Sequence, residues 1–375
     1  MDSLTHKTIK SKNGTLREHQ MMCWISYRSN SAMFLVGAMA LFTAFMGDTF
    51  MSGNQRAEAA EETDNPVVVE YDVVPDWPKR PDHVSGKGWV SGIAVDSKDQ
   101  VWLFRKGPDP IQVYTADGDF VRTWGRDLFV NPHQLRIDPE GNIWVADFGL
   151  HVVQKFSPEG QVLMTLGVRG EKGEDETHFN MPTDMAITPS GDIFVTDGYG
   201  NRRIVHLKPD GTFVKSFGTA GTGPGKFVLP HAIVVNSRGE LYVADRNSGR
   251  IQIFGQDGQF IDQWSNILMP WGISVTPNDE IWVCGSSPHW WFRNGVYPEY
   301  KDQLFMKFSG SGRPLQSWML RLGDIGTDKD HPDTSRLLPG ETVGAHCIAT
   351  DSKMNVYIGD IYGERAQKFV AVYGR

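Results

Sequence analysis

The chain has 375 residues with 40 glycines, 21 prolines and 12 tryptophans, and 40% of its residues are hydrophobic. This composition is typical of a globular, turn-rich protein and excludes a largely disordered chain. The formal net charge of -8 argues against nucleic acid as a partner and favours a small-molecule or peptide ligand.

The first 60 residues have the features of a leader. Basic residues precede an apolar run over residues 32–46, and a small-x-small sequence follows at residues 57–59. A bilayer-spanning helix needs about 20 apolar residues, and the run over residues 32–46 is shorter than that. We therefore interpret residues 1–60 as a secretory signal peptide, with an uncleaved membrane anchor as the alternative. The protein is therefore expected to be periplasmic or secreted, and to contact a membrane only through an uncleaved leader.

One pattern recurs after the leader: an apolar strand, a turn, and a second strand that often ends in V-x-D. Its six copies cover residues 90–105, 132–147, 182–197, 230–245, 270–285 and 345–360. Most copies continue into a third and a fourth short strand, and four strands per repeat form the blade of a propeller. The sequence thus predicts an all-β chain with a six-bladed β-propeller over residues 61–375.

The last copy ends after three strands, whereas residues 67–74 form a strand without a partner of their own. We predict that this N-terminal strand closes the last blade, since closure would remove an exposed sheet edge. Residues 285–303 and 321–342 interrupt the repeat and are expected to be surface loops. The cysteines have no paired spacing that would indicate a disulfide framework, and we expect a monomer.

Aligning the copies by their turns makes the residue before the first strand comparable in all blades. These residues are Ser91, His133, Thr183, His231, Trp271 and His346. Histidine occupies blades two, four and six, and first strands line the channel of a propeller, so three imidazoles would converge on the axis. This set suits zinc, or alternatively iron or copper, but not calcium. The competing interpretation is that the histidines fill the channel mouth or bond to carbonyls.

A second ring comes from the end of the second strand, where the repeat prefers aspartate. Its members are Asp147, Asp197, Asp245 and Asp360, which we expect to bond turn amides. Blade one has Arg105 at this position instead of an aspartate. Tyr199 lies just beyond Asp197, and Arg246 lies just beyond Asp245. We expect the two guanidiniums to bind a carboxylate beside the metal, and the phenol to ionise more easily there. Alternatively, each arginine pairs with a neighbouring aspartate.

These motifs resemble the peptidyl-α-hydroxyglycine α-amidating lyases, a family of six-bladed NHL-repeat propellers, over nearly all of residues 84–370. The matching segments are WVSGIAVD, LFRKG, PHQLRID, GLHVVQKF, MPTDMAITPSGDIFVTDGYGNRRIV, GKFVLPHAIVV, VADRNSGRIQIF and NVYIGD. The resemblance implies a zinc-dependent lyase that splits a peptidyl-α-hydroxyglycine into a peptide amide and glyoxylate. It also implies zinc ligands at His133, His231 and His346, a catalytic tyrosine at Tyr199, and site arginines at Arg105 and Arg246.

The chain departs from that family at several positions. Gly344 to Cys347 replace the motif M-P-H-D, and the missing aspartate binds structural calcium in the family, so calcium is not expected here. Four residues that are not cysteines stand where the family has two disulfides: Asn180, Gly200, Tyr242 and Ile253. Cys347 is either a soft ligand that enlarges the metal site or a small buried hydrophobic residue.

Two other functions remain open. Many NHL propellers bind peptides or proteins through their loops without chemistry, and such a module needs neither a metal nor the three histidines. A metal-dependent hydrolase of the lactonase kind is the other alternative. It would centre calcium on carboxylate and asparagine ligands, whereas this chain offers imidazoles at the axis.

Overall fold

The computed structural model describes residues 68–286, 303–326 and 333–374. The expected leader, residues 1–60, lies outside these residues, as do the inner parts of both expected loops. Within the described part of the chain, no helix is long and apolar enough to cross a membrane. The helical segments described are two 3₁₀ turns, Arg246–Ser248 and Thr334–Arg336. The prediction of an all-β chain is confirmed.

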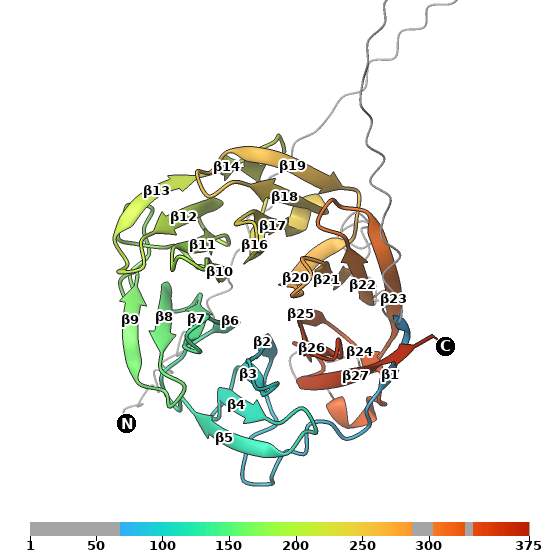
Figure 1. The fold of residues 1–375 in the computed structure, drawn as a ribbon. Helices are drawn as coiled ribbons and strands as arrows, with labels where there is room; N and C mark the ends of the chain where they lie inside the picture. The colour runs from blue at the N-terminus through green and yellow to red at the C-terminus, as the bar shows by residue number, and fades with distance from the viewer. Residues whose placement is uncertain (1–67, 287–302, 327–332, 375) are drawn as a thin grey trace, which may run out of the picture. The chain divides into compact units, whose positions relative to one another are not determined.

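Six antiparallel sheets surround a central axis as the blades of a propeller (Figure 1). Blade one contains β2 (Val90–Val95), β3 (Val101–Arg105), β4 (Ile111–Tyr114) and β5 (Phe120–Trp124). Blade two contains β6 (Pro132–Ile137), β7 (Ile143–Asp147), β8 (Val152–Phe156) and β9 (Val162–Leu166). Blade three contains β10 (Asp184–Ile187), β11 (Ile193–Asp197), β12 (Arg203–Leu207) and β13 (Phe213–Phe217).

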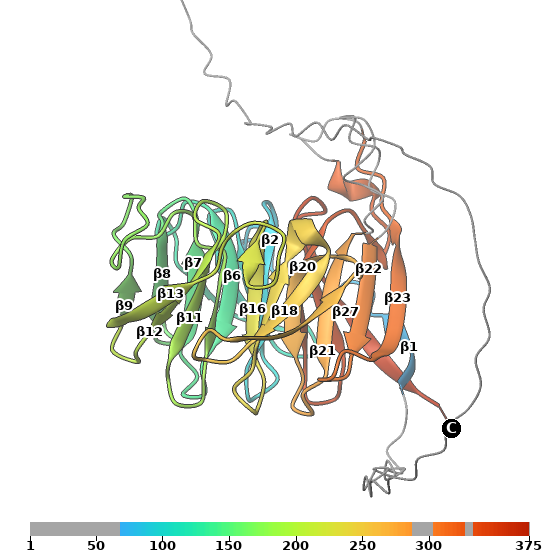
Figure 2. The same cartoon turned by 90° about the horizontal axis from the view of Figure 1, so that it is seen from above.

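The remaining blades follow the same order, with the first strand innermost. A short parallel pair, β14 (Thr219–Ala220) and β15 (Lys226–Phe227), precedes blade four. Blade four contains β16 (Pro230–Val235), β17 (Leu241–Asp245), β18 (Arg250–Phe254) and β19 (Phe260–Ser265). Blade five contains β20 (Met269–Val275), β21 (Ile281–Ser286), β22 (Gln303–Phe308) and β23 (Pro314–Leu322), with β24 (Glu341–Thr342) parallel to β23. Side views of the propeller show neighbouring blades packed face to face (Figure 2).

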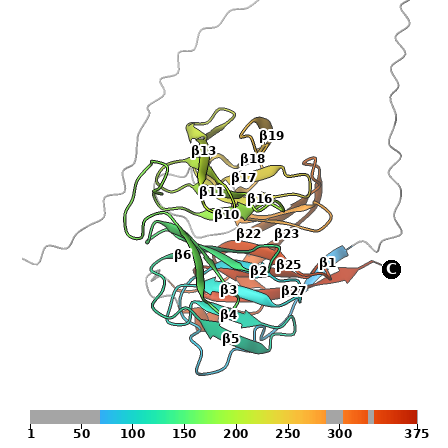
Figure 3. The same ribbon diagram turned by 60° about the vertical axis from the view of Figure 1, so that its left-hand side comes forward.

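Blade six joins the two ends of the propeller sequence, as predicted. It contains β25 (Ala345–Thr350), β26 (Val356–Asp360), β27 (Arg365–Tyr373) and β1 (Val68–Val73). Strand β1 pairs antiparallel with β27, with Val73 opposite Phe369 (Figure 3). The expected loop boundaries are slightly wrong, because the ladder of blade five continues through Ser286 and Leu322.

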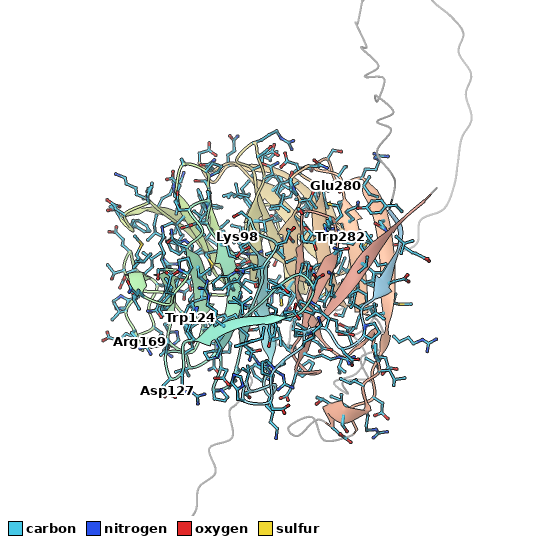
Figure 4. All side chains as sticks on the ribbon, turned by 60° about the horizontal axis from the view of Figure 1, so that its bottom comes forward. Lys98, Trp124, Asp127, Arg169, Glu280 and Trp282 are labelled. Atoms are coloured by element: carbon cyan, nitrogen blue, oxygen red, sulfur yellow. The ribbon has the colours of Figure 1, made fainter. Side chains whose placement is uncertain are left out.

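The apolar core is divided among the six interfaces between neighbouring blades. Each interface has its own cluster of buried side chains, drawn from the facing strands of two blades. In blade five Trp282 is fully buried, whereas Asp127 and Arg169 are exposed at the margin of the ring (Figure 4). Every blade therefore depends on both neighbours for burial of its apolar faces, which holds the axial residues in a fixed ring.

An ion pair between the half-buried Arg136 and the fully buried Asp184 bridges the central channel. Arg136 on β6 donates from Nε to Asp184 on β10 at 3.0 Å, and from a terminal nitrogen to the carbonyl oxygen of Ile273 on β20 at 3.1 Å. Arg136 comes three residues after His133 on the same strand. The guanidinium therefore ties blades two, three and five together along the channel.

Candidate metal centre

A β-bulge precedes the regular part of the first strand in five blades. The residue left out of the ladder is Ser91, His133, His231, Trp271 or His346. In blade three, β10 begins one residue after Thr183. A bulge leaves one residue unpaired and re-aims its side chain, and bulges are common beside active sites. These bulges occur at the repeat position that the sequence singled out.

The three histidines from alternate blades meet at the axis. The ring centres of His133 and His231, and of His133 and His346, are 4.7 Å apart, and those of His231 and His346 are 5.0 Å apart. Each ring offers one nitrogen, and these nitrogens all lie within 4.8 Å of one another. All three side chains are buried. The expected convergence is confirmed.

Main-chain carbonyls fix the orientation of each ring. The Nδ1 atom lies 2.5 Å from Thr183 O in His133, 2.6 Å from Trp271 O in His231 and 2.8 Å from Ser91 O in His346. A carbonyl oxygen only accepts hydrogen bonds, so each Nδ1 carries the proton and each Nε2 keeps its lone pair. Metal-bound histidines are held by the same kind of outer hydrogen bond.

The electrostatics keep these imidazoles neutral. Burial lowers the pKa of His346 to about 4, and it lowers the pKa values of His133 and His231 well below their ordinary range. The charge of Arg246 adds to this effect at all three rings. A neutral imidazole with a free Nε2 lone pair is the form that binds zinc, copper or iron. The donor set thus fits a transition metal.

Tyr199 completes the cluster. Its hydroxyl oxygen lies 2.9 Å from His133 Nε2 and 3.1 Å from His231 Nε2. One phenol proton can serve only one of these two lone pairs at a time. A cation between them would satisfy both nitrogens, which is a second reason why the cluster suits a metal.

The expectation that Tyr199 ionises more easily beside a metal cation stays a prediction, because it depends on the charge of that cation. Burial raises the pKa of the Tyr199 phenol, and although the charge of Arg246 and its hydrogen bond to the phenol oppose this effect, burial dominates. The free-energy cost of removing a phenolate from water is larger than the stabilisation that one adjacent guanidinium provides.

Arg246 lies beside Tyr199, as expected, and is held by aromatic rings. Its guanidinium carbon is 4.3 Å from the ring centre of Trp271 and 5.7 Å from that of Tyr199. Its Nε atom donates to Asn247 Oδ1 at 3.1 Å. The guanidinium also forms a hydrogen bond to the phenol of Tyr199, so both rings and the phenol hold it beside the histidines.

Arg105 forms different contacts from those expected. Its guanidinium donates to the carbonyl oxygens of Ser85 at 3.2 Å and Gly88 at 3.0 Å. The aspartates at the equivalent position hold the segment before their own blade by accepting from its amides. Asp147, for example, accepts from Val130 and Asn131. Arg105 holds the equivalent segment of blade one with the hydrogen-bond direction reversed, so these contacts do not support its place beside the metal.

The structural interpretation of the aspartate ring is confirmed. Asp245 accepts from the amides of Val228 and Leu229, and Asp360 accepts from those of Val343 and Gly344. Asp197 likewise accepts from the amide of Asn180. These carboxylates fix the segments that lead into the first strands and thereby set the position of the axial residues.

Cys347 is a buried apolar side chain and not part of the cluster. It packs with Val90 and Tyr357 in the core between blades six and one. Burial raises the pKa of its thiol well above the ordinary value. The interpretation as a small hydrophobic residue is therefore supported over that of a thiolate ligand.

Two aromatic residues of the centre were not among the predicted site residues. The ring centre of Phe148 lies 5.9 Å from that of His133 and 5.6 Å from that of Tyr199. The ring centre of Trp271 lies 5.8 Å from those of both His231 and His346. Phe148 directly follows the aspartate of blade two, and Trp271 shares the register of the histidines. The repeat alignment that located the histidines therefore also indicates the positions of Phe148 and Trp271.

The family model described as NHL repeat matches residues 179–207 and 227–254. NHL repeat-containing protein 3 of Homo sapiens is 33% identical in an alignment of 313 positions that covers 78% of this chain and 82% of that protein. Peptidyl-glycine alpha-amidating monooxygenase B of Xenopus laevis is 30% identical in an alignment of 351 positions that covers 84% of this chain but 37% of that protein. The chain thus spans little more than a third of that relative.

A relative from Caenorhabditis elegans has the name probable peptidyl-alpha-hydroxyglycine alpha-amidating lyase. It is 34% identical over 175 residues, which are 46% of this chain and 49% of that protein. Among solved structures, that of a streptogramin B lyase superposes with a TM-score of 0.53 and 16% identity, covering 81% of this chain and 97% of that chain. At this identity the likeness concerns the propeller fold alone.

Proposed function

This chain belongs to the NHL-repeat family, and we propose that it is a metal-dependent lyase that cleaves the C–N bond of a peptide-like α-hydroxyglycine, releasing an amide and glyoxylate. The observation that carries the proposal is the set of three neutral imidazoles whose Nε2 atoms face one another beside the phenol of Tyr199. The relatives with lyase names support the same reaction class.

The metal would be held by Nε2 of His133, His231 and His346. When bound, such an ion supplies positive charge that polarises a substrate hydroxyl group and makes its proton more acidic. It would also counteract the effect of burial on the phenol, because a nearby cation favours the ionised form. Zinc is our first choice, with iron and copper as the alternatives.

Two side chains of this chain would carry the remaining chemistry. Tyr199, as the phenolate, takes the proton of the substrate hydroxyl. The electron pair left on oxygen forms the carbonyl of glyoxylate, the C–N bond breaks, and the amide nitrogen receives the proton that Tyr199 took from the hydroxyl. Arg246 binds the substrate carboxylate and is kept beside Tyr199 by the ring of Trp271. Arg105 has no part in this step, because its hydrogen bonds lie in the segment 85–88.

The first test is elemental analysis of the purified full chain beside a variant that combines His133→Ala, His231→Ala and His346→Ala. We expect about one transition metal ion per chain, lost in the variant, since histidine is a preferred ligand of such metals. Glyoxylate release from a dipeptide that ends in α-hydroxyglycine is then measured for both proteins. A wild-type chain that holds no metal when supplied with zinc, iron or copper would refute the proposal.

A non-enzymatic binding propeller is the second candidate, because NHL repeat-containing protein 3, whose name states no reaction, is matched over 82% of its own length. That candidate predicts a metal-free protein that releases no glyoxylate and tolerates the triple substitution. A calcium-centred hydrolase is less favoured, since the histidine cluster is the only group of three or more candidate metal ligands among the described residues.

A further inference from the structure

A cavity of about 530 Å³ lies between blades six and one. Its wall is formed by residues between β1 and β2, by the end of β3, by the beginning of β4, by the segment before β24 and by the beginning of β27. Its volume is within the range of about 300–1,000 Å³ that small-molecule sites occupy. None of the residues of the metal centre lines it, so the cavity is a separate feature of the propeller.

A buried cation without a carboxylate partner lines this cavity. The side chain of Arg105 is 3% exposed, and its Nε atom has no hydrogen-bond partner. Its two terminal nitrogens donate to neutral carbonyl oxygens, and within the described ranges it forms no ion pair. Burial lowers the pKa of Arg105 to about 10. The charge of Arg80 acts in the same direction, whereas Tyr114, Glu364 and Asp109 oppose it. A bound anion stabilises a buried guanidinium of this kind, because it compensates the buried charge.

The repeat shows why this charge is unbalanced. In two blades the arginine that begins the third strand donates from Nε to the aspartate that ends the second strand. These pairs are Arg203 with Asp197 at 3.0 Å and Arg250 with Asp245 at 2.9 Å. In blade six, the Nε atom of the equivalent Arg365 is buried without a partner. In blade one the aspartate itself is replaced by Arg105, and both of these arginines line the same cavity.

The charged groups of the wall are mostly cationic. They are Asp76, Lys79, Arg80, Arg105, Glu364 and Arg365. Lys79 is neutralised by an ion pair with Asp119 at 2.9 Å. The cavity between blades four and five is different, because its Arg238 pairs with Glu240 at 2.7 Å and two further aspartates line it. Of the two cavities, the one between blades six and one has more cations than carboxylates in its wall, and the one between blades four and five does not.

We propose that the cavity between blades six and one is a second ligand site, which binds the carboxylate of a small organic acid. Arg105 and Arg80 recognise the carboxylate, and the apolar part of the acid packs against Trp77 and Leu103, which also line the wall. The site is independent of the proposed lyase reaction and of the metal.

The test is isothermal titration of the full chain with benzoate, which has a carboxylate on a flat apolar ring. Benzamide has the same shape without the charge and is the control ligand. We expect saturable binding of one benzoate per chain and no binding of benzamide. Absence of saturation at millimolar benzoate, or equal binding of benzamide, would overturn the proposal.

Three variants locate the site. Arg105→Gln and the surface substitution Arg80→Gln should each weaken benzoate binding by about ten- to a hundredfold, since each removes a charged hydrogen-bond donor. Arg238→Gln, in the other cavity, is the matched control and should bind as the wild type does. The triple histidine variant should also keep benzoate binding. Loss of binding in that variant would assign benzoate to the metal centre and contradict the proposal, as would unchanged binding in Arg80→Gln.

Discussion

The Nδ1 atom of His346 lies 2.8 Å from the main-chain carbonyl oxygen of Ser91, a residue of the next blade in the ring. The same repeat position forms a similar link in other blades, because the side chains of Ser91 and Thr183 each bond to the carbonyl oxygen of a proline in the following blade, at 3.0 Å. The three histidines and these two hydroxyls thus form a belt of hydrogen bonds between blades. These bonds link five of the six pairs of neighbouring blades, and they also orient the candidate metal ligands.

The first prediction concerns Ser91. Because His346 bonds to the main-chain oxygen of Ser91, the substitution Ser91→Ala should leave the metal content unchanged. It removes the bond from Ser91 Oγ to Pro132 O and should lower the free energy of unfolding by about 1 kcal/mol. Elemental analysis and urea unfolding measure the two effects, with His346→Ala as the metal-free comparison. Loss of metal from Ser91→Ala would mean that the side chain, and not the carbonyl, supports the ligand.

The second prediction concerns Tyr199. The substitution Tyr199→Phe removes the proposed base and should lower kcat for glyoxylate release by about 10²–10⁴-fold. Metal content should stay at the wild-type level, because the three imidazoles and their carbonyl partners are unchanged. Tyr242→Phe is the matched control, since that buried hydroxyl bonds to Gly310 O in another part of the fold. Full activity in Tyr199→Phe would exclude the phenol as the base.

The third prediction concerns Trp271, whose indole supports the guanidinium of Arg246 at 4.3 Å. A cation–π contact of this kind contributes about 0.5–2 kcal/mol, so Trp271→Leu should raise KM by roughly 2–30-fold through weaker carboxylate binding. Trp271→Phe should have an intermediate KM. The metal should be retained in both variants, because the carbonyl that orients His231 belongs to the main chain. If both variants have wild-type KM values, the indole does not position Arg246 for binding.

The sequence predicted the propeller and the axial histidines because both follow from repetition. Six copies with equivalent turns define a common register, and His133, His231 and His346 share one position in it. A register fixes which positions line the axis, so the convergence of these residues could be predicted without coordinates. The closing strand followed from the same argument, since the last copy lacked its fourth strand.

The contacts of Arg105 could not be predicted in this way. The register placed it at the end of a second strand, but the direction of its side chain depends on the segment 85–88, whose carbonyls point toward it. The direction of the Tyr199 pKa shift was also beyond the sequence, because burial of the phenol outweighs the opposing charge of Arg246. Burial and hydrogen-bond direction are properties of packing, which a repeat pattern does not encode.

The last prediction concerns the buried pair of Arg136 and Asp184 in the channel. The carboxylate of Asp184 is fully buried, and its partner on β6 donates to it from two nitrogens. Arg136→Met should lower the free energy of unfolding at pH 7 by about 3–5 kcal/mol, because it leaves an uncompensated buried charge. The double variant Arg136→Met with Asp184→Asn should recover part of the loss in urea unfolding.

The pH dependence of that loss distinguishes a charge effect from a packing effect. Burial raises the pKa of Asp184 even though Arg136 opposes the shift, and removal of Arg136 should raise it further. A carboxyl group with a raised pKa binds more protons in the folded state, so its contribution to stability is most favourable below its unfolded pKa of about 3.9 and is lost as the pH rises through the folded pKa. The destabilisation of Arg136→Met should therefore be smaller at pH 4 than at pH 7. A loss that is equal at both pH values would indicate packing alone.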